Sequence, residues 1–271
     1  MHIKLLLVLI TLPISLYAQS VKAILYKEAI VDGSAIFVDN DEYCPVSVQL
    51  NLKLTNMKST EGNNKIFVVP ARTKKHKITE VLISNKKKGF GFGLETTIGL
   101  GDNELKTYDE NFKYSLPYKK GAAYTITQGY NGKYTHQNEN SIDFDMPVGV
   151  EICAVREGIV IKTEDNNNKH CMDEKCKEYD NYILIYQPDG TFASYSHLKK
   201  KGVLVKEGDK IITGQVIGYS GFVGYASGPH LHFDISTFNL KNQKTVKTYF
   251  LVGNGADVEY LQEHKKYERN Y

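Results

Sequence analysis

The chain contains no tryptophan, and helical periodicity of its apolar residues is weak throughout. It has 19 tyrosines instead, and tyrosine is enriched in strands. The formal net charge is only +3 over 271 residues, whereas binding of duplex nucleic acid usually requires a concentrated basic face. Beyond residue 20, no apolar run approaches the ~20 residues that span a bilayer. We therefore expect an all-β protein that neither binds nucleic acid nor stays inserted in a membrane.

The first 20 residues have the pattern of an export signal. Lys4 precedes a mostly apolar run over residues 5–16, and Ala18 precedes a polar stretch. A short basic start, a compact apolar run and a small residue before polar sequence are typical of a secretory signal. The alternative is a buried strand or helix at the edge of a domain. We predict a signal peptide at residues 1–18 and export to the periplasm or the cell exterior.

Residues 20–112 predict a small N-terminal β-sandwich. Apolar and polar residues alternate without a break from Val46 to Leu54, so we expect one face of this strand to be buried and the other to be exposed to solvent. Several short runs of this kind, separated by turn-prone stretches, are typical of a sandwich. They lie at residues 23–26, 35–38, 66–69 and 81–83.

The remaining sequence predicts a second, mostly antiparallel β domain. A basic stretch with one proline, residues 113–121, is the predicted linker. The second domain then covers residues 122–250, and residues 251–271 form a C-terminal tail. Only residues 258–267 of this tail favour a short helix.

Four cysteines, Cys44, Cys153, Cys171 and Cys176, are compatible with disulfides in an exported protein. They allow three pairings, among which sequence does not choose, although Cys171 and Cys176 are close enough to close a small loop. A second metal site of His170, Cys171 and Cys176 is the alternative. No second cysteine pair is placed to complete its tetrahedral set.

Two histidines lie two residues apart in the segment Gly228-Pro229-His230-Leu231-His232-Phe233. Residues two apart on a strand point to the same face. His230 and His232 therefore project together, while Leu231 and Phe233 pack on the other side. Such a pair suits a metal ion, or a ligand beside a proton carrier; two structural histidines are the alternative.

An acidic residue lies in an apolar stretch that follows the polar loop carrying His136. Asp143 stands between Ile142 and Phe144, where a carboxylate is costly to bury unless it is paired or binds a cation. Asp145 shares the same strand face, so periodicity alone leaves either carboxylate as the ligand.

A third segment, residues 193–198, places His197 at the end of an alternating strand. Two histidines and one carboxylate leave a coordination position open on zinc, as in catalytic sites. A water at that position has a pKa of about 7, and spare imidazoles can act as general base and as stabiliser of an oxyanion. These residue types are what metal-assisted hydrolysis of a carbonyl requires.

Three segments occur in a fixed order along the second domain: His136 through Asp143 to Met146-Pro147-Val148-Gly149, then Tyr195-Ser196-His197-Leu198, then Gly218-Tyr219-Ser220-Gly221 leading into residues 228–233. In these segments the sequence resembles the lysostaphin-type zinc endopeptidases of bacterial cell walls. The resemblance covers about residues 121–250 and implies a mostly antiparallel β fold with an open cleft.

The resemblance also implies the roles of individual residues. One zinc ion would be bound by His136, Asp143 and His232, and the catalytic histidines would be His197 and His230. It also favours Asp143 over Asp145, because in the family the metal-binding aspartate stands a fixed short distance before the Met-Pro pair in the sequence. Six residues separate His136 from Asp143, whereas many members have three. Some members have a tyrosine facing the substrate at the position of Tyr130.

The activity implied is hydrolysis of peptide bonds in peptidoglycan, either in a D,D-cross-link between stem peptides or in a glycine-containing bridge. The main alternative is a catalytically inactive relative that binds the wall or activates another hydrolase, but such relatives typically lose residues that are all present here. A non-haem iron oxygenase also uses two histidines and a carboxylate without needing His197 and His230. A sugar- or peptide-binding role without chemistry suits the N-terminal domain alone, and no regulatory partner is identified.

Overall fold

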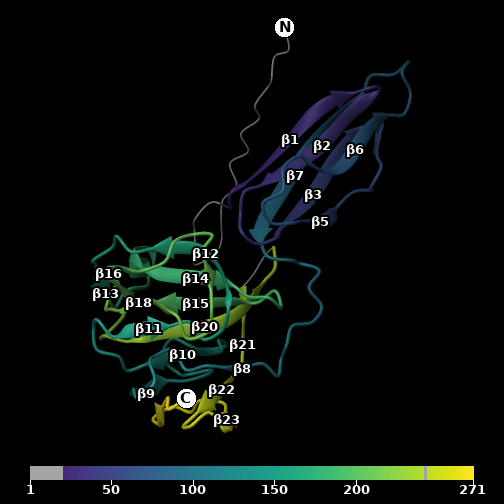
Figure 1. The fold of residues 1–271 in the computed structure, drawn as a ribbon. Coiled ribbons are helices and arrows are strands. Elements are labelled where there is room, and N and C mark those ends of the chain that lie inside the picture. The colour runs from purple at the N-terminus through teal and green to yellow at the C-terminus, as the bar shows by residue number, and fades with distance from the viewer. Residues whose placement is uncertain (1–20, 241–242) are drawn as a thin grey trace. The chain divides into compact units, whose positions relative to one another are not determined.

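A computed structural model describes residues 21–240 and 243–271 of the chain. It divides into two compact units, Met1–Glu104 with Phe238–Asn242 (the N-terminal unit) and Leu105–Thr237 with Gln243–Tyr271 (the C-terminal unit) (Figure 1). The predicted signal peptide, residues 1–18, lies outside the described residues. Within those ranges, no helix has the length and apolar character that a bilayer crossing demands.

The N-terminal unit is a β-sandwich, as predicted. One sheet has the order β1 (Ala23–Ile30), β2 (Gly33–Asn40), β6 (His76–Ile83) and β4 (Met57–Ser59), and the other has the order β5 (Lys65–Val69), β3 (Val46–Thr55) and β7 (Gly91–Leu100). Val46, Val48, Leu50 and Leu52 alternate along β3 and are at most 3% exposed. They share one core with residues of β2 such as Ile36, so the alternation correctly predicts the buried face.

The C-terminal unit is built on a nine-stranded antiparallel sheet (Figure 1). Its strands are, in order, β17 (Lys210–Ile211), β12 (Gly158–Glu164), β14 (Tyr182–Tyr186), β15 (Phe192–Ser196), β20 (Leu231–Phe238), β10 (Ser141–Phe144), β9 (Ala123–Gln128) and β24 (Lys266–Glu268), and β21 (Gln243–Val246) pairs with β20. Along β20, the apolar Leu231, Phe233 and Ile235 enter the core. The intervening residues of β20 therefore project from the opposite face.

Smaller sheets complete the C-terminal unit. One sheet has the order β11 (Glu151–Cys153), β18 (Val216–Ser220) and β16 (Leu198–Val203). Another has the order β23 (Asp257–Glu259), β22 (Tyr249–Val252) and β8 (Lys113–Tyr114). The strands β13 (His170–Cys171) and β19 (Gly224–Tyr225) form a parallel pair. A 3-10 helix, η1 (Glu174–Tyr179), is the only helix in the described ranges. The expected all-β fold is confirmed.

The segments flanking the predicted second domain belong to the C-terminal unit. In the predicted linker, residues 113–121, β8 pairs with β22, and Tyr114, Leu116 and Tyr118 are buried in the core. The helix expected at residues 258–267 is wrong. Tyr267 lies on β24 and is buried, and the β24 backbone pairs with β9, so tertiary pairing overrides the weak local preference.

Cys171 on β13 and Cys176 on η1 form a disulfide that links these two elements. Because the disulfide uses both sulfurs, the alternative metal site with His170 is wrong. Cys44 and Cys153 are buried, and they belong to different units.

A buried ion pair in the C-terminal unit gives a stability prediction. Asp189 Oδ2 accepts a hydrogen bond from Arg156 Nη1 at 2.7 Å, and the two side chains are 12% and 6% exposed. Burial alone would raise the pKa of Asp189, but hydrogen bonds from Thr191 and Arg156 outweigh it and hold the pKa below its usual value. Asp189→Asn leaves Arg156 buried without its carboxylate partner, so we expect a loss of about 3 kcal/mol at pH 7.

Hydrogen exchange of amides in the C-terminal unit measures this loss. Because the folded-state pKa is depressed, the stabilisation is present above the unfolded pKa, about 4, and is lost as the pH falls through the folded value. The difference between wild type and variant should therefore shrink below pH 4. Glu157→Gln is the control: Glu157 lies 3.9 Å from Arg156 Nε but is half exposed, and should change stability by less than about 1 kcal/mol. Equal effects of the two substitutions would refute the assignment.

Candidate metal centre

Three neighbouring strands carry a polar row across one face of the large sheet. Asp143 on β10 is in register with His232 on β20, and His232 is in register with Ser196 on β15. On β10, Ile142 and Phe144 alternate with Asp143 and are buried in the core. The alternation that buries the apolar residues therefore places Asp143 and His232 side by side on the other face.

His136 joins this pair from the loop before β10. The distance from His136 Nε2 to His232 Nδ1 is 3.3 Å, and that to Asp143 Oδ2 is 3.4 Å. His232 Nδ1 lies 2.9 Å from Asp143 Oδ1. One atom of each residue lies within 4.8 Å of the others, and no second group of three such residues is found in residues 21–240 and 243–271. Asp145, the rival carboxylate, is exposed and lies outside the group.

The donor set fits zinc. Two imidazole nitrogens and a carboxylate oxygen are typical ligands of a catalytic zinc site with one position open. Ligand atoms about 2.0–2.1 Å from a tetrahedral ion lie about 3.4 Å apart, and two of the three observed distances are close to this value. Burial alone would raise the pKa of Asp143, but hydrogen bonds with His136 and His232 hold it well below its usual value. The carboxylate is therefore ionised, as a ligand must be.

Gln128 at the end of β9 connects the histidine loop to Asp143. Its Nε2 donates to Asp143 Oδ2 at 3.0 Å and to Thr135 Oγ1 at 2.7 Å. Its Oε1 accepts from the backbone N–H groups of Tyr134 and Thr135, both at 3.0 Å. Gly129 O lies 3.1 Å from His136 Nδ1 and accepts from it when that nitrogen is protonated, so Nε2 faces the site. These contacts hold the loop that carries His136 against β9, so His136 reaches Asp143 although six residues separate the two in the sequence.

Gln128→Ala is expected to weaken zinc binding while leaving the three ligands in place. Partners that orient metal ligands typically contribute ten- to a hundredfold in affinity, and we expect about tenfold here. Competition with a fluorescent zinc chelator measures the affinity. Gln262→Ala, in the same unit but with no side-chain hydrogen bond to the three ligands, is the control. Unchanged affinity in Gln128→Ala would refute this role.

His197 and His230 lie beside the three residues. Their ring centroids are 4.6 Å apart, and His197 is 5.8 Å from the ring of His232. His230 Nε2 lies 3.7 Å from Asp143 Oδ1, while His230 Nδ1 is 2.8 Å from Gly228 O. All five residues singled out in the sequence analysis thus gather at one place.

The pKa values of these two imidazoles shift in opposite directions. Burial lowers the pKa of His230 to about 4. Burial would also lower that of His197, but the nearby Asp180 carboxylate outweighs it and raises the pKa above its usual value. Titratable groups whose environments shift their pKa values apart are the groups that can serve as proton acceptor and proton donor in one site.

Three residues at the site were not singled out by the sequence analysis. They are Gln128, Gly129 and Asp180. Only the pairing of β9 with β10 places Gln128 beside Asp143, and no local pattern encodes such pairing. The resemblance placed Tyr130 facing the substrate. In the structure the Tyr130 hydroxyl donates a hydrogen bond to Thr248 O at 2.8 Å.

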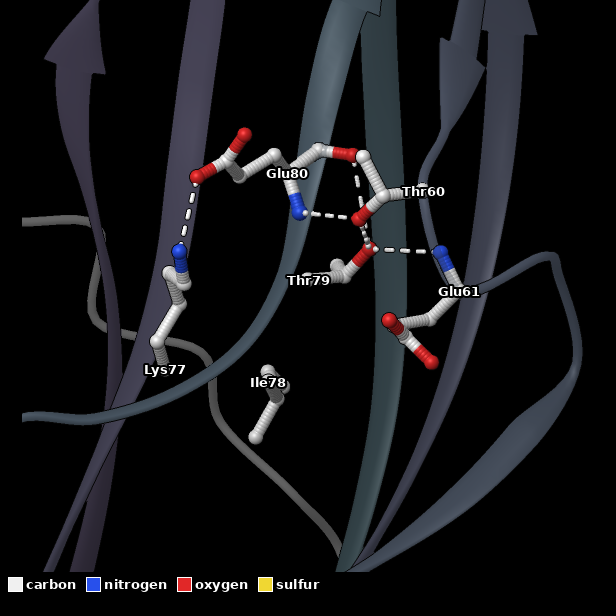
Figure 2. Close-up of a pocket in the computed structure, with 6 residues that line it drawn as sticks. All are labelled: Thr60, Glu61, Lys77, Ile78, Thr79 and Glu80. Atoms are coloured by element: carbon white, nitrogen blue, oxygen red, sulfur yellow. Dashed lines mark hydrogen bonds and ion pairs between the residues drawn. The ribbon is translucent and has the colours of Figure 1, made fainter.

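Polar cavities of about 260 and 200 Å³ lie among the described residues of the N-terminal unit. Figure 2 shows the larger one, where Lys77 pairs with Glu80 at 2.8 Å and the backbone N–H of Glu80 donates to Thr60 Oγ1 at 3.1 Å. Its lining contains no histidine or cysteine. Its polar groups largely satisfy one another, so we assign no chemistry to it.

Comparison with known families decides the class of the C-terminal unit. The sequence model described as Peptidase family M23 matches residues 137–247. This range contains Asp143, His197, His230 and His232, and His136 immediately precedes it. The chain carries a peptidase family M23 domain. The resemblance inferred from the three motifs is thereby confirmed.

Relatives of this M23 domain include several peptidases. An uncharacterized metalloprotease from Buchnera aphidicola is 29% identical over 225 residues, covering 77% of this chain and 54% of the relative. The peptidoglycan DD-endopeptidase ShyA of Vibrio cholerae is 35% identical over 96 residues, covering 35% and 20%. The glycyl-glycine endopeptidase ALE-1 of Staphylococcus capitis is 35% identical over 127 residues, covering 46% and 31%. The chain thus spans about half or less of the length of these relatives.

Proposed function

We propose that the chain is an exported zinc-dependent endopeptidase that hydrolyses peptide bonds in bacterial peptidoglycan. The observation that supports this most strongly is the convergence of His136, Asp143 and His232, drawn from a loop and two strands, with ligand atoms within 4.8 Å. In the proposal they bind one zinc ion, and His197 and His230 are the catalytic histidines.

When bound, zinc supplies Lewis-acid chemistry for attack of water on a carbonyl. The imidazoles of His230 and His197 accept a proton and donate a hydrogen bond, respectively. His230, whose pKa is low, is neutral at pH 7 and its Nε2 faces Asp143, so it can accept a proton from the attacking water. His197 has a raised pKa, and in its protonated form both ring nitrogens carry a hydrogen, so Nε2 can donate a hydrogen bond to the oxygen on which negative charge develops.

The substrate class follows from the relatives. ShyA is named a peptidoglycan DD-endopeptidase and ALE-1 a glycyl-glycine endopeptidase, so we propose either a D,D-cross-link or a glycine-containing bridge as the bond that is cut. Peptidoglycan lies outside the cytoplasmic membrane, which agrees with the export signal predicted at residues 1–18. We therefore propose a location in the periplasm, at the cell envelope or outside the cell.

Digestion of purified peptidoglycan, followed by mass spectrometry, tests the proposal. Cross-linked muropeptides with a direct D,D-bond and with a glycine bridge are offered separately. We expect one to be cut, inhibition by a chelator, and recovery with stoichiometric zinc. A protein that binds zinc but cuts neither bond would instead support the inactive, wall-binding alternative.

A further inference from the structure

A carboxylate outside the proposed ligand and catalytic set contacts His197 twice. Asp180 Oδ1 accepts a hydrogen bond from the His197 backbone N–H at 2.9 Å. The same oxygen lies 3.1 Å from His197 Nδ1. One carboxylate oxygen thus contacts both the backbone and the ring of a proposed catalytic residue.

The backbone of His197 needs such support. Its φ is 62°, in the left-handed region that costs residues with a side chain about 1–2 kcal/mol. Conformations of this kind persist when the surrounding contacts determine them. The residues that follow His197 and Asp180 also hold each other in place. The Leu198 N–H donates to Asn181 O at 3.0 Å, and Asn181 Nδ2 donates to Leu198 O at 3.1 Å.

The contacts also select one tautomer of the ring. His197 Nδ1 lies 2.8 Å from Val223 O and 3.1 Å from Asp180 Oδ1. Both neighbours are acceptors, so Nδ1 carries the proton of the neutral ring, and protonation of the ring then adds a hydrogen to Nε2. Nε2, on the other side of the ring, is left free for the reacting groups.

Asp180 follows the disulfide-closed loop and lies against β19. Cys171 and Cys176 are joined by the disulfide. The helix η1 ends at Tyr179, and Asp180 is its C-cap, whose backbone N–H donates to Lys177 O at 3.2 Å. On another side lies Gly224 of β19, with φ +88°, where an added Cβ would be 3.1 Å from Asp180 Cα. The end of η1 and the close approach of β19 therefore restrict the position of Asp180.

We propose that Asp180 is a positioning residue for His197. It holds the imidazole with its proton on Nδ1 and fixes the backbone at residue 197, so that Nε2 is presented to the reacting groups. This inference rests on the proposed catalytic role of His197. It predicts that loss of the Asp180 carboxylate affects turnover and leaves zinc binding unchanged.

Kinetics of Asp180→Ala and Asp180→Asn test the proposal on a defined muropeptide. For Asp180→Ala we expect kcat to fall about ten- to a hundredfold, with KM and zinc content unchanged. Asp180→Asn keeps the size and one oxygen acceptor, so its loss should be smaller. Glu178→Gln, which removes an exposed carboxylate from the same loop, should retain wild-type kcat.

A double-mutant cycle separates positioning from general structural damage. If Asp180 acts through His197, adding Asp180→Ala to His197→Ala should lower kcat by no more than about threefold further. An undiminished loss in that background would overturn the proposal. So would loss of zinc from Asp180→Asn, or an effect on KM alone.

The histidine tautomer gives a readout that does not depend on activity. In protein with ¹⁵N-labelled histidine, at a pH high enough for the His197 ring to be neutral, NMR should show His197 protonated on Nδ1 in wild type and a mixture of tautomers in Asp180→Ala. The same tautomer population in both proteins would overturn the role of Asp180. If wild type cuts no muropeptide but shows this difference, the proposed peptidase function fails and the positioning contact stands.

Discussion

His232→Ala is expected to abolish both zinc binding and cleavage of peptidoglycan. His232 Nδ1 lies 2.9 Å from Asp143 Oδ1 and 3.3 Å from His136 Nε2, so its removal takes one of three proposed ligands from the centre of the group. A metal contributes several kcal/mol to stabilising the charge of a transition state. A loss of about 4 kcal/mol corresponds to about a thousandfold in rate.

Zinc content by elemental mass spectrometry and turnover of a muropeptide measure the two effects together. His264→Ala is the matched control, because His264 lies in the same unit and its side chain is 81% exposed. This control should keep one zinc per chain and full activity. Stoichiometric zinc in purified His232→Ala would contradict the ligand assignment.

His197→Ala is expected to keep its zinc and lose most of its activity. Its Nδ1 faces Val223 O and Asp180, and it belongs to no group of possible ligands in the described residues. Removal of a residue that transfers protons or donates hydrogen bonds in the transition state typically costs 10²–10⁴-fold, and we expect kcat to fall by about 10³-fold.

The contrast between the two variants separates a ligand from a catalytic residue. Equilibrium dialysis against zinc should give the same affinity for His197→Ala and wild type, while single-turnover cleavage should be slowed. A His197→Ala protein that loses its zinc would show that His197 belongs to the ligand set. One that cuts at the wild-type rate would remove it from the mechanism.

Alternation of apolar and polar residues predicted the parts of the site that lie on strands. Asp143 between Ile142 and Phe144, and His232 between Leu231 and Phe233, follow the side-chain period of two along β10 and β20. Periodicity alone did not separate Asp143 from Asp145. The structure does so, because the strand ends at Phe144 and Asp145 is exposed.

Contacts that depend on strand pairing and loop conformation could not be predicted. Gln128 meets Asp143 through the pairing of β9 with β10, and Asp180, which precedes His197 by 17 residues, meets it from the end of a loop before β14. Neither of these two contacts is encoded by a local sequence pattern. For the same reason residues 258–267 suggested a helix, although Tyr267 is buried on a strand that pairs with β9.

Diffraction data collected at the zinc absorption edge test the central claim most directly. The account predicts one anomalous peak bonded to His136 Nε2, Asp143 and His232 Nδ1, with bond lengths of about 2.0–2.2 Å. A zinc-loaded crystal with no peak between these three side chains, or with a peak bonded to Asp145 in place of Asp143, would contradict it.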